Sequence, residues 1–524
     1  MRKLLILFSI CFSATLFAQK GAPHNWQTMD PKFDKIYGIG SEQAYKILAG
    51  KTPKTIIVAV IDGGVDINHE DLKDIIWTNP GEIPDNGIDD DKNGYIDDVH
   101  GWSFLGGKNG DINHEASELS RLYHHLNKIY DHADTTNFTA TQLKEYVQYK
   151  KIKHEFLAEK EKNEQELQGI EMFNDFLVKV KNQNNGKLTK EGLKNYVPEN
   201  KMETTLKKTL KMFFTFGLKP EDLDNQVKEG YDEISNTVKY ANINVDSIRQ
   251  YIVGDDPNNP DERYYGCNRV KGPDALHGTH VTGIIAAIRN NNIGINGIAN
   301  NVKIMVIRAV PNGDERDKDI ANAIRYAVDN GASIINMSFG KYYSPDKKVI
   351  DDAVKYALSK DVLLIHAAGN ESKNNEVEYS YPCREMLTGE TVNNWISVGA
   401  NSYKKGKNIL GSFSNYGKTK VDFFAPGVDI YSTVSDNKYL SESGTSMAAP
   451  STTGAAAIIR EYFPELKANE VRDILMKTVV PYKHKVKVPG SAKDKKYLKE
   501  LCKSGGFVNV NNAVIELMGL NKKK

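Results

Sequence analysis

Apolar runs alternate with amphipathic stretches over most of this chain. Residues 55–61 form a continuous apolar, β-branched run, and residues 333–340 and 362–370 have the same strand-like character. Such runs are typical of strands buried on both faces of a parallel sheet. Residues 320–328 and 349–358 have apolar side chains at helical spacing. Because strands that alternate with helices form parallel βαβ units, the pattern predicts an α/β fold class.

The pattern changes between about residues 113 and 265. This segment is rich in Lys, Glu, Gln and Tyr, and no proline occurs between Pro84 and Pro198. Its apolar residues recur at helical spacing in two clear groups: Leu119, Leu122, Leu126 and Ile129, then Leu223, Val227, Tyr231, Ile234 and Val238. Pro220 followed by two acidic residues is typical of a helix start. The segment is therefore predicted to be a large helical insertion.

The first 18 residues have the features of an export signal. Arg2 and Lys3 precede a mainly apolar stretch, and Ala18 is a small residue suited to cleavage. No later stretch approaches the roughly 20 apolar residues of a membrane span. We therefore expect an exported protein, periplasmic or extracellular, without stable membrane insertion.

The composition limits the kinds of partner that the chain can be expected to bind. The 524 residues are 40% hydrophobic and 26% charged, which is typical of a globular chain. The net charge of +1 indicates no strong field for nucleic acid, a membrane surface or acidic substrates. Beyond the signal, Cys267, Cys383 and Cys502 allow at most one disulfide within the chain.

The candidate catalytic residues lie at the ends of predicted strands and helices. Asp62 follows the first buried strand, His277 opens an apolar helix, and Ser446 precedes a helix of small residues. A serine hydroxyl needs a neighbouring base, and a carboxylate can orient an imidazole for that role. Asn370, at the end of another strand, can donate its amide N–H to an oxyanion beside the backbone N–H of Ser446. Taken alone, a serine before a helix is more often an N-cap, so the argument depends on all four residues together.

An acidic stretch at residues 89–98 is a candidate metal site. Its potential ligands fall at positions 1, 3, 5, 7 and 9 of a calcium-binding loop: Asp89, Asp91, Asn93, the carbonyl of Tyr95, and Asp97. No glutamate stands at position 12, so the loop is not a complete EF-hand. A structural calcium ion and a merely solvated acidic turn are both compatible with this pattern.

Four motifs together resemble the subtilisin-like serine proteases (subtilases, peptidase S8). They are Asp-Gly-Gly at residues 62–64, His-Gly-Thr-His-Val at 277–281, Ala-Ala-Gly-Asn at 367–370 and Gly-Thr-Ser-Met-Ala-Ala-Pro at 444–450. The Asp, His, Ser order is also that of subtilisin. The first motif has Gly where Ser or Thr is usual in the family.

The resemblance implies a secreted serine endopeptidase that cleaves peptide bonds through an acyl-enzyme, with Asp62, His277 and Ser446 as the triad. Asn370 and the Ser446 N–H would form the oxyanion hole. Ser338, Phe339, Gly340 and Gly369 would bind an extended polypeptide substrate. No cofactor is required for this chemistry, and the oligomeric state is left open.

The resemblance also defines the expected domain organisation, a three-layer catalytic domain with a parallel sheet, interrupted by the helical insertion. The expected parts are a signal peptide (1–18), an N-terminal segment (19–40), the first part of the catalytic domain (41–112), the insertion (113–265), the second part of the catalytic domain (266–520) and a basic tail (521–524).

Two further classes of function remain open. The chain could be a catalytically silent binding or chaperone-like protein on this scaffold, or an esterase that uses the same triad. The separation of Asp62 and His277, 277 − 62 = 215 residues, exceeds the few tens usual in the family. The insertion could therefore pack on its own domain, gate the cleft, bind a partner or replace a folding-assisting prodomain.

Overall fold

The computed structural model describes residues 21–215 and 219–520. The predicted signal peptide (1–18) and basic tail (521–524) lie outside the described residues. The chain divides into two compact units. The larger contains Ala22–Glu115 and the chain from Asp246 onward, and the smaller contains Ala116–Val245.

A parallel sheet forms the centre of the larger unit. Within the described residues it has nine strands in the order β12-β15-β9-β8-β7-β6-β1-β5-β2. All neighbouring strands are parallel except β12 and β15. The strands are β1 (Ile56–Asp62), β2 (Gly101–Ser103), β5 (Val302–Arg308), β6 (Ile334–Met337), β7 (Leu363–Ala367), β8 (Trp395–Asn401), β9 (Phe423–Pro426), β12 (Val480–Pro481) and β15 (Gly506–Phe507).

The position of β1 decides where the site lies. β1 pairs with β5 on one side, where Asp62 is opposite Arg308, and with β6 on the other. The strand order therefore reverses at β1, and open α/β sheets place their ligand sites at the carboxyl ends of strands beside such a reversal.

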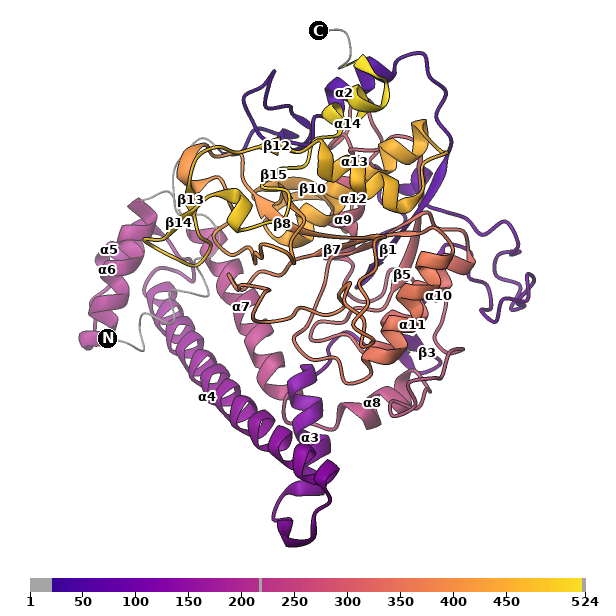
Figure 1. Ribbon diagram of the computed structural model, residues 1–524. Helices are drawn as coiled ribbons and strands as arrows, with labels where there is room; N and C mark the ends of the chain where they lie inside the picture. Colours follow the sequence, from indigo (N-terminus) through magenta and orange to yellow (C-terminus); the bar gives the residue numbers. More distant parts are fainter. Residues whose placement is uncertain (1–20, 216–218, 521–524) are drawn as a thin grey trace. The chain divides into compact units, whose positions relative to one another are not determined.

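Helices cover both faces of this sheet (Figure 1). Val58 and Val60 of β1 belong to the same apolar core as α9 and α12, whereas Ala59 and Ile61 belong to the core of α10 and α11. The continuous apolar run of β1 is thus explained by burial on both sides, and the predicted α/β three-layer fold is confirmed. The helices of this unit are α2 (Ser41–Leu48), α8 (Val245–Ile252), α9 (Leu276–Ala286), α10 (Asp317–Asp329), α11 (Lys347–Ser359), α12 (Thr445–Tyr462), α13 (Ala468–Lys477) and α14 (Val510–Leu517).

Short elements complete the larger unit. Three two-stranded sheets pair β3 (Gly106–Gly107) with β4 (Gly110–Asp111), β10 (Ile430–Val434) with β11 (Lys438–Glu442), and β13 (Val486–Lys487) with β14 (Lys495–Lys496). The short 3₁₀ turns in the described chain are η1 (Trp26–Thr28), η2 (Lys73–Ile75), η3 (Thr135–Asn137), η4 (Gly406–Asn408) and η5 (Leu498–Glu500), of which η3 belongs to the smaller unit.

The smaller unit is helical. It contains α3 (Glu118–Tyr130), α4 (Ala140–Asn182), α5 (Lys190–Asn195), α6 (Lys201–Thr215) and α7 (Pro220–Tyr240). A capping box between Thr139 and Gln142 begins the long α4, and Pro220 stands in the first turn of α7. Phe173 and Leu177 of α4 share an apolar core with Leu223 of α7, so this unit has a core of its own.

The smaller unit ends earlier than the predicted insertion. The insertion was expected to reach residue 265, but residues 246–265 belong to the larger unit. One contact that holds them there is made by Arg249, whose side chain is 1% exposed and pairs with Asp255 at 2.9 Å and with Asp319 of α10 at 2.7 Å. A buried guanidinium with two carboxylate partners ties this segment to α10.

The structure also describes helix length and cysteine pairing. Among residues 21–215 and 219–520, no helix has the length and apolar character needed to cross a bilayer. Cys267, Cys383 and Cys502 are all free thiols, so none of the described cysteines uses the single disulfide that the count allowed.

Candidate active site

Asp62 and His277 come together although 215 residues separate them. Asp62 is the last residue of β1, and His277 lies in the first turn of α9. His277 Nδ1 lies 2.8 Å from Asp62 Oδ1 and 3.0 Å from Oδ2. A carboxylate that accepts from Nδ1–H leaves Nε2 as the basic nitrogen.

The approach of α9 to β1 depends on a glycine. A Cβ on Gly278 would lie 2.1 Å from the carbonyl oxygen of Gly64 and 3.2 Å from the Cβ of Asp62. Any side chain here would push the helix away from the strand end. Gly278 therefore permits the contact between Asp62 and the neighbouring histidine.

The electrostatics favour a basic His277. Burial by itself lowers the pKa of His277, but the Asp62 carboxylate outweighs it, with smaller contributions from Glu442 and Asp274, so that the net pKa is raised above its usual value. The His277 side chain is 45% exposed whereas that of Asp62 is 4% exposed. The imidazole is thus open to a substrate on one side and held by a buried carboxylate on the other.

His280, one turn further along α9, has a different environment. Burial lowers the pKa of His280 to about 3, so its imidazole is neutral. Its Nε2 lies 3.0 Å from the carbonyl oxygen of Ile430, in β10. This histidine connects α9 to a neighbouring hairpin and lies apart from the Asp62 carboxylate.

Ser446 lies in the first turn of α12, one residue after the helix begins at Thr445, and Gly444 is the N-cap. The Ser446 hydroxyl donates to the carbonyl of Ser338 at 3.1 Å, and the Ser338 hydroxyl donates to the carbonyl of Ser446 at 2.9 Å. Among the described residues, Ser446 Oγ has no hydrogen bond to His277. This reciprocal pair places the serine at the carboxyl end of β6, next to β1. The N–H of Ser446 lies in the first turn, where helical amides have no partner within their own helix.

Asn370 is oriented by the residue before the serine. Its Oδ1 accepts from the N–H of Thr445 at 2.8 Å and from the Thr445 hydroxyl at 2.9 Å. Asn370 Nδ2 has no hydrogen bond with another described residue, and it lies 3.6 Å from the point that a Cβ on Gly444 would occupy. The amide nitrogen is therefore free to donate next to Ser446.

Of the residues predicted to bind substrate, Ser338, Phe339 and Gly340 follow β6, and Gly369 follows β7. Ser338 is 5% exposed and is occupied by its bonds to Ser446 and Asn336. Gly340 lies where a Cβ would come within 2.9 Å of Ser380 Oγ, and Gly369 has φ +107°. Phe339 is partly buried against the core of α10 and α11. A side chain at Gly340 would therefore crowd Ser380, and one at Gly369 would require a left-handed backbone conformation.

Three contributors to this site were missed from the sequence. Thr445 orients Asn370, and Asp274 and Glu442 add negative charge around His277. Thr445 stood inside the quoted serine motif, but its role depends on a contact across 75 residues. Glu442 had no sequence signal at all.

The acidic loop brings together a different set of carboxylates from the predicted one. Glu82, Asp91 and Asp98 each offer one oxygen, and these oxygens lie within 4.8 Å of one another. Only Asp91 belonged to the predicted ligand set of Asp89, Asp91, Asn93, Tyr95 and Asp97. Burial raises the pKa of both Glu82 and Asp98, with further raising by neighbouring carboxylates.

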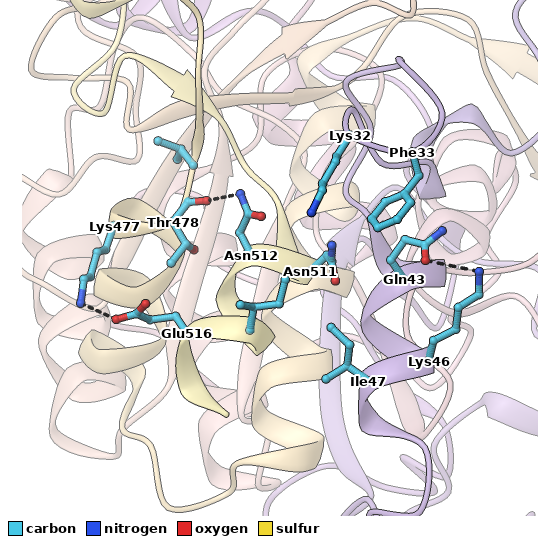
Figure 2. A pocket seen from close by; sticks show the side chains of 12 residues that line it. Lys32, Phe33, Gln43, Lys46, Ile47, Lys477, Thr478, Asn511, Asn512 and Glu516 are labelled. Atoms are coloured by element: carbon cyan, nitrogen blue, oxygen red, sulfur yellow. Dashed lines mark hydrogen bonds and ion pairs between the residues drawn. The ribbon is translucent and has the colours of Figure 1, made fainter. Parts of the chain in front are cut away.

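A separate pocket of about 490 Å³ lies between α2 and the segment of α13 and α14 (Figure 2). None of the candidate catalytic residues lines it. Two of its lysines already have partners, because Lys477 pairs with Glu516 and Lys46 donates to Gln43. This surface cavity is therefore distinct from the Asp62–His277 pair.

The larger unit is thus an open, mostly parallel α/β sheet whose carboxyl edge carries the Asp62–His277 pair and the helix-borne Ser446. A profile of the Subtilase family (peptidase S8) matches residues 53–505. The chain therefore belongs to the subtilase family, which confirms the resemblance inferred from the four motifs.

Named relatives agree with this assignment. A thermophilic serine proteinase from Bacillus sp. (strain AK1) is 39% identical over 240 residues, which are 45% of this chain and 48% of that protein. Subtilisin DY from Bacillus licheniformis is 36% identical over 204 residues, 38% of this chain and 69% of the relative. The major intracellular serine protease of Bacillus subtilis (strain 168) is 38% identical over 214 residues, 39% of this chain and 63% of the relative. The match thus spans about half the length of the thermophilic proteinase.

Proposed function

We propose that this protein is a serine endopeptidase that hydrolyses peptide bonds in polypeptide substrates. The observation that carries the proposal is the Asp62–His277 pair at the end of β1, with Ser446 held at the end of the adjacent β6 and the free amide nitrogen of Asn370 oriented by Thr445. Family membership and the serine proteinases among the relatives support it.

The proposed mechanism assigns each group one task. His277 Nε2 takes the proton of the Ser446 hydroxyl as Oγ attacks the peptide carbonyl carbon, and returns that proton to the leaving amine. Asp62 keeps Nδ1 protonated and stabilises the imidazolium. The Asn370 Nδ2 and the Ser446 N–H donate to the oxyanion. Water, activated by the same imidazole, then hydrolyses the acyl-enzyme.

The hydroxyl of Ser446 must turn away from Ser338 for this step. It donates to the Ser338 carbonyl, an acceptor that cannot take the proton. Rotation about χ1 frees the oxygen for His277 without moving the helix, because the backbone of Ser446 stays held through the Ser338 hydroxyl. Catalytic hydrogen bonds commonly tighten only when substrate is bound.

The backbone edge formed by Ser338, Phe339 and Gly340 favours a peptide over a small ester. An extended chain can add to such an edge through main-chain hydrogen bonds, as in β-augmentation. All the proposed catalytic and substrate-binding residues belong to the larger unit, which we propose as the catalytic domain, with the helical unit as an inserted subdomain. The sequence features of residues 1–18 support export to the periplasm or the exterior.

The test is hydrolysis of casein and of a mixed peptide library by the purified protein, beside Ser446→Ala. Ser443→Ala is the matched control, since it removes an exposed neighbouring hydroxyl in the same loop. We expect activity in the parent and in Ser443→Ala, and none above background in Ser446→Ala. A fluorophosphonate probe should label the parent at Ser446.

Other outcomes separate the competing functions. A folded parent that neither hydrolyses peptides nor reacts with the probe would support a silent binding protein and contradict the proposal. Cleavage of small acyl esters without any cleavage of casein or peptides would assign the site to ester hydrolysis instead.

A further inference from the structure

The surface cavity beside α2 is walled by segments that are distant in the sequence. Its volume of about 490 Å³ is in the range usual for ligand sites, about 300–1,000 Å³. Lys32 and Phe33, from the chain before α2, lie on one side of it, and Lys477 of α13 lies on the other (Figure 2). Asn511 of α14 lies between them. This cavity is called the α2–α14 pocket below.

Asn511 has an amide oxygen without a partner. The residue is 3% exposed, and its Oδ1 is buried and has no hydrogen bond with any other described residue. Its Nδ2 donates to Oδ2 of Asp30 at 3.1 Å. Because a carboxylate only accepts, this bond fixes which amide atom is the nitrogen. Asp30 does not line the pocket, so Nδ2 is turned away from it and Oδ1 is left for its contents.

The protein does not supply the missing donor from the neighbouring amide. Nδ2 of Asn512 donates to the carbonyl of Thr478 at 3.1 Å instead. A buried acceptor without a donor costs free energy that a ligand with an N–H group would recover. The oxygen of Asn511 therefore indicates a ligand that donates a hydrogen bond.

The walls of the pocket carry more positive than negative charge. Three lysines line it, against the single glutamate that pairs with Lys477 at 2.8 Å. Among the described residues, neither Lys32 nor Lys46 forms an ion pair. The Nζ of Lys46 donates to the neutral side chain of Gln43 at 3.3 Å. Two ammonium groups are thus available to an anionic group of a ligand.

Apolar side chains complete the lining. Phe33, Ile47, Val479 and Ile515 all belong to it. The side chain of Phe33 is 55% exposed, so covering its ring would remove apolar surface from water. The pocket therefore offers an apolar surface next to the lysines and to the amide oxygen of Asn511.

We propose that the α2–α14 pocket binds the C-terminal residue of a polypeptide whose last side chain is apolar. The α-carboxylate of such a residue suits the lysines, its backbone N–H suits Oδ1 of Asn511, and its side chain suits the surface around Phe33. These three groups are attached to one Cα atom, so one residue brings them together. A simple carboxylic acid lacks the N–H, and an internal peptide segment lacks the α-carboxylate.

This binding goes beyond the proposed peptidase activity. None of the proposed catalytic or substrate-binding residues lines the pocket, so a bound terminus would be held apart from the catalytic residues. Binding is measured without hydrolysis, and its failure would therefore leave the proposed activity untouched.

Fluorescence anisotropy tests the proposal on the full chain carrying Ser446→Ala, in which the proposed nucleophile cannot cleave the probe. The probe is a fluorescein-labelled pentapeptide that ends in leucine with a free carboxylate. Three altered probes each remove one feature. A C-terminal amide removes the charge, an N-methyl group on the last residue removes the donor, and glycine as the last residue removes the apolar side chain.

Variants of the pocket locate the bound probe. Lys32→Gln combined with Lys46→Gln removes two positive charges, and Phe33→Ala removes the exposed ring. The matched control combines Lys54→Gln with Lys405→Gln, at two exposed lysines that do not line the pocket. All five side chains are exposed, so these variants should keep the Tm of the parent.

We expect saturable binding of the leucine probe. The amide should bind at least about 10-fold more weakly, because a hydrogen bond to a charged group is lost, and the N-methyl probe about 5-fold more weakly. The glycine probe and Phe33→Ala should each weaken binding about 5-fold through lost apolar contact. The double lysine variant should also cost about 5-fold, whereas its control stays within about twofold of the parent.

The proposal is overturned if the leucine probe shows no saturable binding up to about 1 mM. Equal binding of the amide probe or of the N-methyl probe would contradict recognition of a chain terminus. Competition by 4-methylpentanoate as strong as that by N-acetylleucine would show that the pocket takes a carboxylic acid without a peptide N–H. Binding that the pocket variants leave unchanged, or that the control lysines weaken equally, would place the peptide elsewhere on the protein.

Discussion

Replacing Asn370 by alanine tests the proposed oxyanion hole. The amide oxygen of Asn370 accepts two hydrogen bonds from Thr445, at 2.8 and 2.9 Å, so the amide plane is fixed and Nδ2 is left to donate. Such a donor strengthens its bond as negative charge develops on the carbonyl oxygen. Its removal should therefore lower kcat and leave KM nearly unchanged.

The expected loss in kcat is about 10²–10³-fold, or about 2.7–4 kcal/mol, a magnitude taken over from the equivalent loss in the family member subtilisin. Thr445→Val provides a graded comparison. It removes one of the two bonds that orient Asn370, and a net hydrogen bond is worth about 0.5–1.5 kcal/mol. We therefore expect a loss of about 2- to 12-fold, since about 1.4 kcal/mol corresponds to a factor of ten.

The assay is a fluorogenic peptide cleaved by the parent, with kcat and KM measured separately at a temperature where both variants are folded. Folding must be checked by circular dichroism, because Thr445 is fully buried and loses partners in both variants. A kcat for Asn370→Ala within threefold of the parent would refute the assignment. A loss confined to KM would make Asn370 a substrate-binding group instead.

Three further predictions follow from the larger unit. The kcat/KM should rise with pH as His277 loses its proton, with a midpoint above the usual histidine pKa. Asp274→Asn should move this midpoint to lower pH, because removing a nearby negative charge favours the neutral imidazole. An unchanged midpoint in the pH series of Asp274→Asn would contradict this prediction. Gly278→Ala should lower kcat/KM about 10²-fold by displacing the helix, and an active variant would show that α9 can shift without harm. Arg249→Met should destabilise the protein by about 3–5 kcal/mol in urea unfolding, because two buried aspartates lose the guanidinium that they share, although Lys318 still pairs with Asp255. The exposed Lys348→Met should change little, and equal effects of the two substitutions would refute the buried pair.

The spacing of apolar residues along the chain predicted much of the fold, because it reflects which faces of each helix or strand are buried. The run at residues 55–61 is apolar without alternation, since β1 has helices on both faces. Pro220 and the apolar spacing after it similarly marked α7. Both signals arise within one element and need no knowledge of distant contacts.

The candidate catalytic residues were also accessible from sequence, because each lies in a short motif at the end of an element. Asp62 ends β1, and Ser446 begins α12 beside the carboxyl end of β6. The order of the motifs predicted their proximity. Their catalytic roles stay predictions until the variants above are measured.

Contacts between distant segments were decided only by the tertiary structure. Spacing along residues 89–98 suggested a linear metal loop, but Glu82 precedes it and the carboxylates of Asp89 and Asp97 are taken by backbone N–H groups. Likewise, the sequence contained no signal that Thr445 orients Asn370 or that Arg249 helps to keep residues 246–265 in the larger unit. The physical reason is common to these cases. A linear pattern specifies which face of an element is buried, whereas the partner of a polar side chain depends on which segments the folded sheet brings within hydrogen-bonding distance.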